Sequence, residues 1–181
     1  MKHIPNILSY FRILLIPVFI WFMRNNQGWE AALVLAFSGL TDITDGYLAR
    51  RFDWISDWGK VLDPLADKMT QLTVCIILVL KMREYWFFFA ILIFKEAVMI
   101  IFGIYLFKNK IKIEGAKWFG KLFTILFYIS MVIIVLLPGM HDKLIIALLT
   151  LTTLCALVAC YLYFPEFSKY KQEAKELKNA L

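Results

Sequence analysis

Residues 42–67 read DITDGYLARRFDWISDWGKVLDPLAD, and they lie where one long apolar stretch ends and the next begins. The whole chain is 61% hydrophobic with a mean hydropathy of +0.70, well above the composition of soluble proteins. Most of the chain is therefore expected to lie in lipid. Ionisable side chains inside a membrane helix cost roughly 3 kcal/mol each, so this acidic stretch indicates a functional site.

Six stretches surround and include the acidic segment, each near the roughly 20 apolar residues that a membrane-spanning helix needs. They cover residues 8–23, 30–50, 59–80, 85–107, 117–138 and 143–164. The sequence thus predicts an all-α integral membrane protein of six transmembrane helices, preceded by an N-terminal interfacial segment. We expect one membrane domain over residues 1–165 and a charged cytoplasmic tail over 166–181.

The distribution of basic residues predicts the orientation of these helices. The net charge of +6 is not a sign of nucleic-acid binding, because the basic residues flank apolar runs instead of mixing with aromatic residues on a soluble surface. Four basic residues fall on one side of the predicted membrane: Arg24, Lys81, Arg83 and Lys143. The other side holds Lys2, Arg50, Arg51, Lys108, Lys110, Lys112, Lys117, Lys169, Lys171, Lys175 and Lys178. We expect a multi-pass protein of the cell membrane with both termini and the acidic site facing the cytoplasm.

The acidic stretch has the residue types of a site for hard metal ions. The chain has only two histidines, and its three cysteines show no metal-ligand spacing, so carboxylates must supply the ligands. Asp42 and Asp45 share one helix face, and Asp63 and Asp67 share another. Four carboxylates held together would repel one another without cations. The pattern predicts two Mg²⁺ or Mn²⁺ ions, an arrangement that stabilises both oxygens of an in-line phosphoryl displacement.

Small residues accompany the aspartates on the same helix faces. Gly46, Ala49 and Gly59 lack bulk, which lets a nucleotide approach the helix backbones, and Arg50 can neutralise a diphosphate. Close helix packing explains the small residues equally simply. The residues by themselves leave both interpretations open.

The segment resembles the signature of the CDP-alcohol phosphatidyltransferase family, D-x-x-D-G-x-x-A-R-x8-G-x3-D-x3-D, without departure. Its eight fixed positions span 26 residues. The resemblance implies that Asp42, Asp45 and Asp63 bind metal, and that Asp67 both touches metal and acts as the catalytic base. It also implies that Gly46, Ala49, Arg50 and Gly59 contact the CDP group, and that proteins similar to this one form homodimers. Asn6 is expected either to join the CDP site or simply to cap the first helix.

Three further stretches resemble the branch of the family whose acceptor is glycerol 3-phosphate: IPNILSYFR at 4–12, LDPLADK at 62–68 and GKLFT at 120–124. The resemblance implies transfer of a phosphatidyl group from CDP-diacylglycerol to glycerol 3-phosphate, with release of CMP. A phosphorylated acceptor needs nearby cations, and the candidates are Arg12, Lys95, Lys117 and Lys121. Lys95 has an alternative role as the buried partner of Glu96 or of an aspartate.

One departure keeps the acceptor open, since the branch usually has Arg-Glu where this chain has Lys95-Glu96, and lysine lacks the bidentate fork of arginine. The runner-up acceptor is phosphatidylglycerol, as in cardiolipin synthases of the same family, and a phosphoinositol acceptor ranks below it. A cation transporter is the remote alternative, and it is disfavoured because the sequence has no visible pair of inverted halves.

Overall fold

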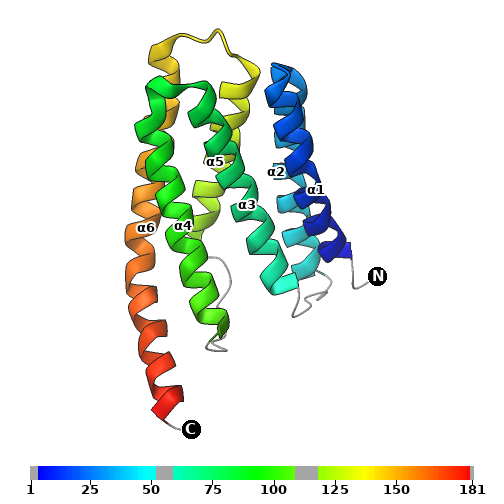
Figure 1. Ribbon diagram of the computed structural model, residues 1–181. Coiled ribbons are helices and arrows are strands. Elements are labelled where there is room, and N and C mark those ends of the chain that lie inside the picture. The colour runs from blue at the N-terminus through cyan, green and yellow to red at the C-terminus, as the bar shows by residue number, and fades with distance from the viewer. Residues whose placement is uncertain (1–3, 52–58, 109–117, 180–181) are drawn as a thin grey trace.

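The computed structural model describes residues 4–51, 59–108 and 118–179, and all regular elements of these segments are helices (Figure 1). They are α1 (Ile4–Arg24), α2 (Gly28–Arg51), α3 (Gly59–Lys81), the 3-10 helix η1 (Arg83–Tyr85), α4 (Trp86–Lys108), α5 (Trp118–Leu136) and α6 (Asp142–Asn179). The predicted all-α fold is confirmed, and six α-helices lie where the sequence predicted six membrane spans.

The helices are arranged as a closed ring. Each α-helix packs mainly on two neighbours, and the order around the ring is α1, α2, α5, α6, α4, α3 and back to α1. Successive helices alternate in direction, so both ends of the described chain lie at the end of the bundle that also holds the C-terminus of α2 and the N-terminus of α3 (Figure 1). The side chains of all six α-helices therefore pack into one shared interior.

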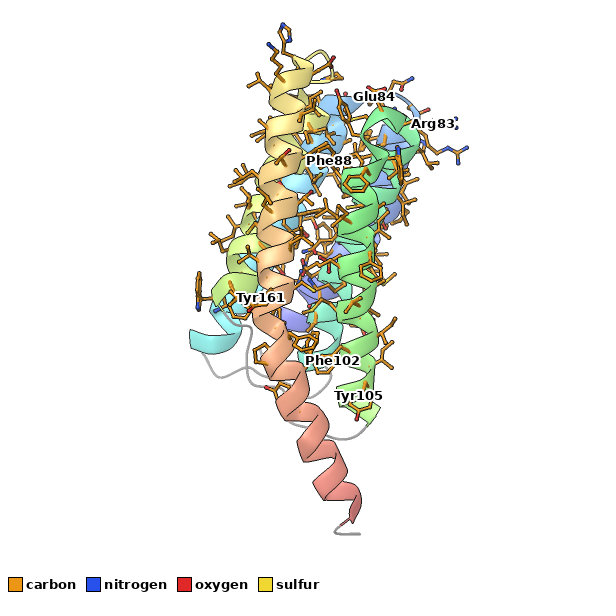
Figure 2. All side chains as sticks on the ribbon, turned by 90° about the vertical axis from the view of Figure 1, so that its left-hand side faces the viewer. Arg83, Glu84, Phe88, Phe102, Tyr105 and Tyr161 are labelled. Atoms are coloured by element: carbon orange, nitrogen blue, oxygen red, sulfur yellow. The ribbon has the colours of Figure 1, made fainter. Side chains whose placement is uncertain are left out.

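Four of the helices are long and apolar enough to cross a membrane. The candidate spans are Ile7–Arg24, Arg83–Tyr105, Trp118–Leu136 and Asp142–Pro165. Helices α2 and α3 are as long as these but carry the charged signature residues, including Asp42 on α2 and Asp67 on α3. Large apolar side chains cover the outside of the bundle, such as Tyr161 on α6, which is 79% exposed (Figure 2). Such an apolar exterior is what a membrane protein presents to lipid.

The end of the bundle away from the signature is closed by short connections. Between α1 and α2 the chain turns at Asn26, whose φ of 58° lies in the left-handed region that asparagine tolerates. Lys81 at the end of α3 donates a 2.6 Å hydrogen bond to the Asn26 side chain. Near α4, the Tyr85 hydroxyl donates to Asp142 at the start of α6 over 3.1 Å. These contacts join neighbouring helix ends and hold the helices at fixed heights relative to one another.

Helix α6 continues well beyond the last predicted span. It runs without interruption through Pro165 to Asn179, so much of the predicted tail is helical. The extension packs on α4 through aromatic rings: Phe102 and Phe167 have centroids 3.8 Å apart, and Tyr170 is buried. Phe102 lies toward the end of α4 that faces this extension (Figure 2).

Candidate active site

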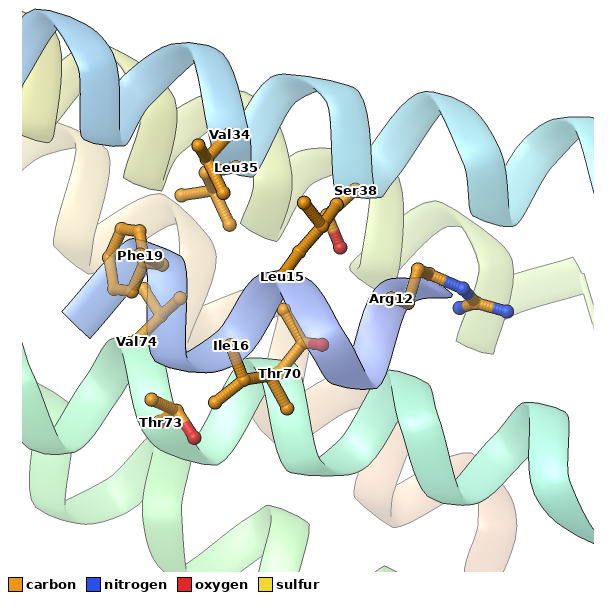
Figure 3. Close-up of a pocket in the computed structure, with 10 residues that line it drawn as sticks. All are labelled: Arg12, Leu15, Ile16, Phe19, Val34, Leu35, Ser38, Thr70, Thr73 and Val74. Atoms are coloured by element: carbon orange, nitrogen blue, oxygen red, sulfur yellow. The ribbon is translucent and has the colours of Figure 1, made fainter. Parts of the chain in front are cut away.

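Arg12 and Asp42 form the first contact of the site, between α1 and α2. The Arg12 guanidinium donates to Asp42 Oδ1 over 2.5 Å, and the arginine side chain is completely buried. The sequence predicts that Arg12 binds the acceptor and that Asp42 binds a metal. Helix α1 lies between α2 and α3 here (Figure 3), so it brings the Arg12 guanidinium to Asp42. The residue spacing within the signature does not reveal this contact.

Asp67 on α3 is buried and both of its oxygens have partners. Oδ1 accepts a 2.9 Å hydrogen bond from the Gln71 side-chain amide, one turn further along the helix. Oδ2 lies 3.2 Å from Lys68 Nζ. The carboxylate of the predicted base is therefore held in one orientation by two side chains of its own helix. The sequence singled out neither; for Gln71, the spacing of four residues from Asp67 is the signal that points to it, whereas Lys68 directly follows Asp67 and has no such signal.

A chain of charges leads from Asp67 to α4. Lys68 Nζ also lies 3.0 Å from Glu96 Oε2, and Glu96 Oε1 is paired with Lys95 Nζ at 2.5 Å. The Lys95 ammonium lies 3.5 Å from the centroid of the Phe123 ring, a cation–π contact. The structure thus brings the acceptor candidate Lys95 into the same network as Asp67, and it also confirms the pairing of Lys95 with Glu96.

Tyr128 on α5 and Ser38 on α2 complete the polar interior. Both are buried, and the Tyr128 ring packs against Gly39, the residue next to Ser38 on α2. Neither residue stands out in the sequence, because a tyrosine and a serine inside apolar helices are common packing residues. Their proximity becomes visible only when the ring brings α2 and α5 together.

A narrow pocket extends from this site between α1, α2 and α3 (Figure 3). Its walls are mostly apolar, and its polar members include Arg12, Ser38 and Thr70. Figure 3 shows the Arg12 side chain at one end of the pocket. Ser38 therefore borders a small cavity.

The remaining predicted residues are not all described at side-chain level. Lys121 lies on α5 and is exposed. The structure describes only the helix backbone at Asn6, Asp45, Gly46, Ala49, Arg50, Gly59 and Asp63, and Lys117 lies outside the described residues. The backbone places Asp45, Gly46, Ala49 and Arg50 in the last turns of α2, and Gly59 and Asp63 in the first turns of α3.

The residues present fit divalent metal by the chemistry of their donors. Within the described part of the chain no three His, Cys, Asp or Glu side chains gather, and Asp42 and Asp67 are the two predicted ligands whose side chains can be followed. Each of these carboxylates already has a cation beside it, Arg12 or Lys68. Both carboxylates nevertheless supply oxygen donors, the ligand type that hard divalent cations prefer.

Comparison with known proteins agrees with this site. The family model for CDP-alcohol phosphatidyltransferase matches residues 2–163. The CDP-diacylglycerol–glycerol-3-phosphate 3-phosphatidyltransferase of Aquifex aeolicus is 30% identical over 82% of this chain and 83% of that protein. The enzyme of the same name from Pseudomonas fluorescens is 39% identical over 46% of this chain. The cardiolipin synthase (CMP-forming) of Streptomyces coelicolor is 37% identical over 54% of this chain.

The matched stretches cover about half the length of the last two relatives, 45% and 48%. They do not separate the two acceptor classes, since relatives named for each are similar to this chain at nearly equal identity. The match of the family model over residues 2–163, together with the unbroken signature between Asp42 and Asp67, shows that the chain belongs to the CDP-alcohol phosphatidyltransferase family.

Proposed function

We propose that this protein transfers a phosphatidyl group from CDP-diacylglycerol to glycerol 3-phosphate and releases CMP. The observation that carries the proposal is the complete signature at residues 42–67, two of whose aspartates, Asp42 on α2 and Asp67 on α3, are paired with the cations Arg12 and Lys68. Relatives named for this reaction, one of them matched over 83% of its length, support the choice of acceptor.

The reaction joins the acceptor oxygen to the phosphorus that bears diacylglycerol and breaks the bond from that phosphorus to CMP. Asp67 accepts the proton that the acceptor hydroxyl loses. Gln71 and Lys68 hold the Asp67 carboxylate in place, so that it meets the hydroxyl without a search through rotamers.

Metal binding is assigned to Asp42, Asp45, Asp63 and Asp67. Two divalent ions, Mg²⁺ or Mn²⁺, would offset the negative charge that builds on the phosphate oxygens. The CDP side of the site is assigned to Gly46, Ala49, Gly59, Asn6 and Arg50, whose guanidinium neutralises the diphosphate. The acceptor side is assigned to Lys95, Lys117, Lys121 and Arg12.

The membrane setting suits these substrates. The acyl chains of the donor stay in lipid while the nucleotide and glycerol 3-phosphate reach the site from water. We place the site and both termini on the cytoplasmic side of the cell membrane, which the excess of basic residues at that end supports. The domain ends near residue 165 and the charged tail follows. A homodimer is the proposed assembly, on the family resemblance.

A second acceptor, phosphatidylglycerol, is favoured by a specific observation. The cardiolipin synthase relative from Streptomyces coelicolor is 37% identical to this chain, and the protein has Lys95 where glycerol 3-phosphate enzymes of the family usually have arginine. Lysine offers a single point charge instead of a planar fork.

The deciding experiment supplies purified protein with CDP-diacylglycerol, Mg²⁺ and one acceptor at a time, and identifies the lipid product by mass. We expect phosphatidylglycerophosphate with glycerol 3-phosphate. Cardiolipin from phosphatidylglycerol, with no product from glycerol 3-phosphate, would replace the leading acceptor. Absence of CMP release with every alcohol would refute phosphatidyl transfer, and a transporter would give that result.

A further inference from the structure

Glu96 is a carboxylate near the middle of α4, one of the four helices that are long and apolar enough to cross a membrane. Its side chain is only 1% exposed. An ionisable group inside a membrane helix is costly, and such residues usually serve a function. Glu96 is neither a proposed metal ligand nor a cation for phosphate, so its burial needs another explanation.

Two lysines compensate for the charge of Glu96. Lys68 of α3 places its Nζ atom 3.0 Å from Glu96 Oε2, and Lys95 of α4 is paired with Oε1. A buried carboxylate between two ammonium groups is held in one place, because moving it away would leave charges in the interior without a partner. Glu96 is therefore a fixed anchor for the Lys68 ammonium.

The Lys68 ammonium also joins the side chains around Asp67. It lies 3.2 Å from Asp67 Oδ2 and donates a 3.4 Å hydrogen bond to Gln71 Oε1. An ammonium group has three N–H donors, so it can direct one at each of the three oxygens around it. The Gln71 amide in turn donates to Asp67 Oδ1. Asp67, Lys68 and Gln71 thus form one closed group of side chains, which Glu96 fastens to α4.

Helix geometry alone does not direct Lys68 toward Asp67. Residues that follow each other directly in a helix do not face each other, and the long lysine side chain is flexible. The ion pair with Glu96 draws the ammonium to the side of α3 that packs on α4, where Asp67 Oδ2 is within reach. The contact of Lys68 with Asp67 therefore depends on a residue of another helix.

We propose that Glu96 is a positioning residue: it holds the Lys68 ammonium against Asp67, so that the carboxylate of the proposed base stays turned toward the acceptor hydroxyl. The inference rests on the proposed phosphatidyl transfer. Glu96 itself touches no reacting atom and acts through Lys68. Without this anchor the Lys68 side chain can leave Asp67, and the carboxylate gains rotamers that do not meet the hydroxyl. A displacement of about 1 Å at a reacting group can cost roughly 100-fold in rate.

The first test is Glu96→Gln, which keeps nearly the same size and removes the charge that holds Lys68. With donor and acceptor both saturating, we expect kcat to fall roughly tenfold or more. The KM for CDP-diacylglycerol should stay within about twofold, because only the base is misplaced. Glu84→Gln is the matched control, since Glu84 is an exposed carboxylate in η1 just before α4, and this variant should match the wild type.

A double mutant shows whether Glu96 acts through Lys68. Lys68→Met removes the ammonium, so Glu96 then has nothing to hold against Asp67. We expect kcat of the variant carrying both Lys68→Met and Glu96→Gln to lie within about twofold of Lys68→Met alone, as for two residues that act in series. Losses that multiply in the double mutant would overturn the inference.

Other results would also overturn it. Unchanged kcat in Glu96→Gln with a lower melting temperature would make Glu96 a structural link between α3 and α4. A change confined to the acceptor KM would mean that it acts through Lys95. If Glu96→Gln does not fold, Glu96→Asp replaces it: the charge stays, but the carboxylate is one methylene shorter, and kcat should again fall with the donor KM unchanged. Wild-type kcat in Glu96→Asp would refute the positioning role.

The proposed function is judged separately, on the wild-type protein. If its product is cardiolipin, the leading acceptor fails, and the Glu96 variants are then compared with phosphatidylglycerol as the acceptor. If the wild type releases no CMP with any alcohol, phosphatidyl transfer itself fails, and the role of Glu96 fails with it. A wild type that works and a Glu96→Gln variant that works equally well would overturn the role of Glu96 alone.

Discussion

Arg12 on α1 is completely buried and paired with Asp42 on α2, one of the proposed metal ligands. Taking a guanidinium out of water is costly unless a carboxylate compensates for it. The pair therefore does two things at once: it fastens α1 to α2, and it gives Asp42 a counter-charge. A divalent ion bound by Asp42 would share that carboxylate with Arg12 or displace it.

Arg12→Gln is expected to destabilise the metal-free protein by about 2 kcal/mol. The figure is below that of a fully buried pair because the Asp42 side chain is 25% exposed. Saturating Mg²⁺ should raise the melting temperature of the variant by more than it raises that of the wild type, because the Arg12 guanidinium no longer competes for Asp42. Thermal unfolding in detergent, with EDTA and with Mg²⁺, measures both effects.

Arg24→Gln is the control for this prediction, since Arg24 is an exposed arginine at the end of the same helix. It should unfold at the wild-type temperature in both buffers. Equal stabilisation of Arg12→Gln and wild type by Mg²⁺ would show that Arg12 and the metal do not share Asp42.

Asp42→Asn, Asp45→Asn and Asp63→Asn are each expected to lower turnover by roughly 100-fold or more. An amide is a neutral and poorer ligand for a hard cation, and even an outer-shell partner of a metal site is worth about 10–100-fold. Binding of Mn²⁺, followed by its paramagnetic resonance signal, should weaken in parallel. Near-normal turnover at limiting Mg²⁺ in any of the three would remove that residue from the metal site.

Asp67 should behave differently because it is also the proposed base. Asp67→Asn is expected to lose turnover while its affinity for CDP-diacylglycerol changes little. Comparable losses in affinity and turnover would make Asp67 mainly a metal ligand.

The sequence predicted the helices well because their signal is local. Each helix needs only its own run of apolar residues, and the six predicted stretches correspond to α1 through α6 within a few residues at most ends. The end of α6 is the exception, since the helix continues past Pro165 to Asn179. This extension packs through the contact of Phe102 on α4 with Phe167 on α6, and a contact between two helices cannot be predicted from the local pattern of either one.

The sequence predicted the site residues that belong to one motif, and it missed the contacts that form between different helices. The spacing of the aspartates depends on one helix at a time, so the signature reveals it. The pairing of Arg12 with Asp42, and of Lys68 with Glu96, depends on which helices are neighbours. The sequence indicated that the aspartates need cations beside them, and the structure supplies Arg12 from α1 to Asp42 and Lys68 from α3 itself to Asp67.

Lys95 and Lys121 are predicted to bind the phosphate of glycerol 3-phosphate. Lys95→Met or Lys121→Ala should raise the KM for this acceptor roughly tenfold or more, because a hydrogen bond to a charged group is worth about 1.5–3 kcal/mol. The KM for CDP-diacylglycerol should hardly change. Lys143→Ala, at the opposite end of the bundle, is the control. Acceptor kinetics that are indifferent to both lysines would refute this part of the pocket.

Gly39→Ala tests how closely α2 packs on α5. The new methyl group would lie 3.1 Å from the Tyr128 ring, so the ring must shift by a few tenths of an ångström. We expect the melting temperature in detergent to fall below that of the wild type, although alanine favours helix over glycine by about 1 kcal/mol. Gly103→Ala is the matched control, because nothing lies within 4 Å of a Cβ at Gly103 on α4. Its melting temperature should equal or exceed that of the wild type. A melting temperature of Gly39→Ala as high as that of Gly103→Ala would mean that the tyrosine ring yields to the methyl group at no cost.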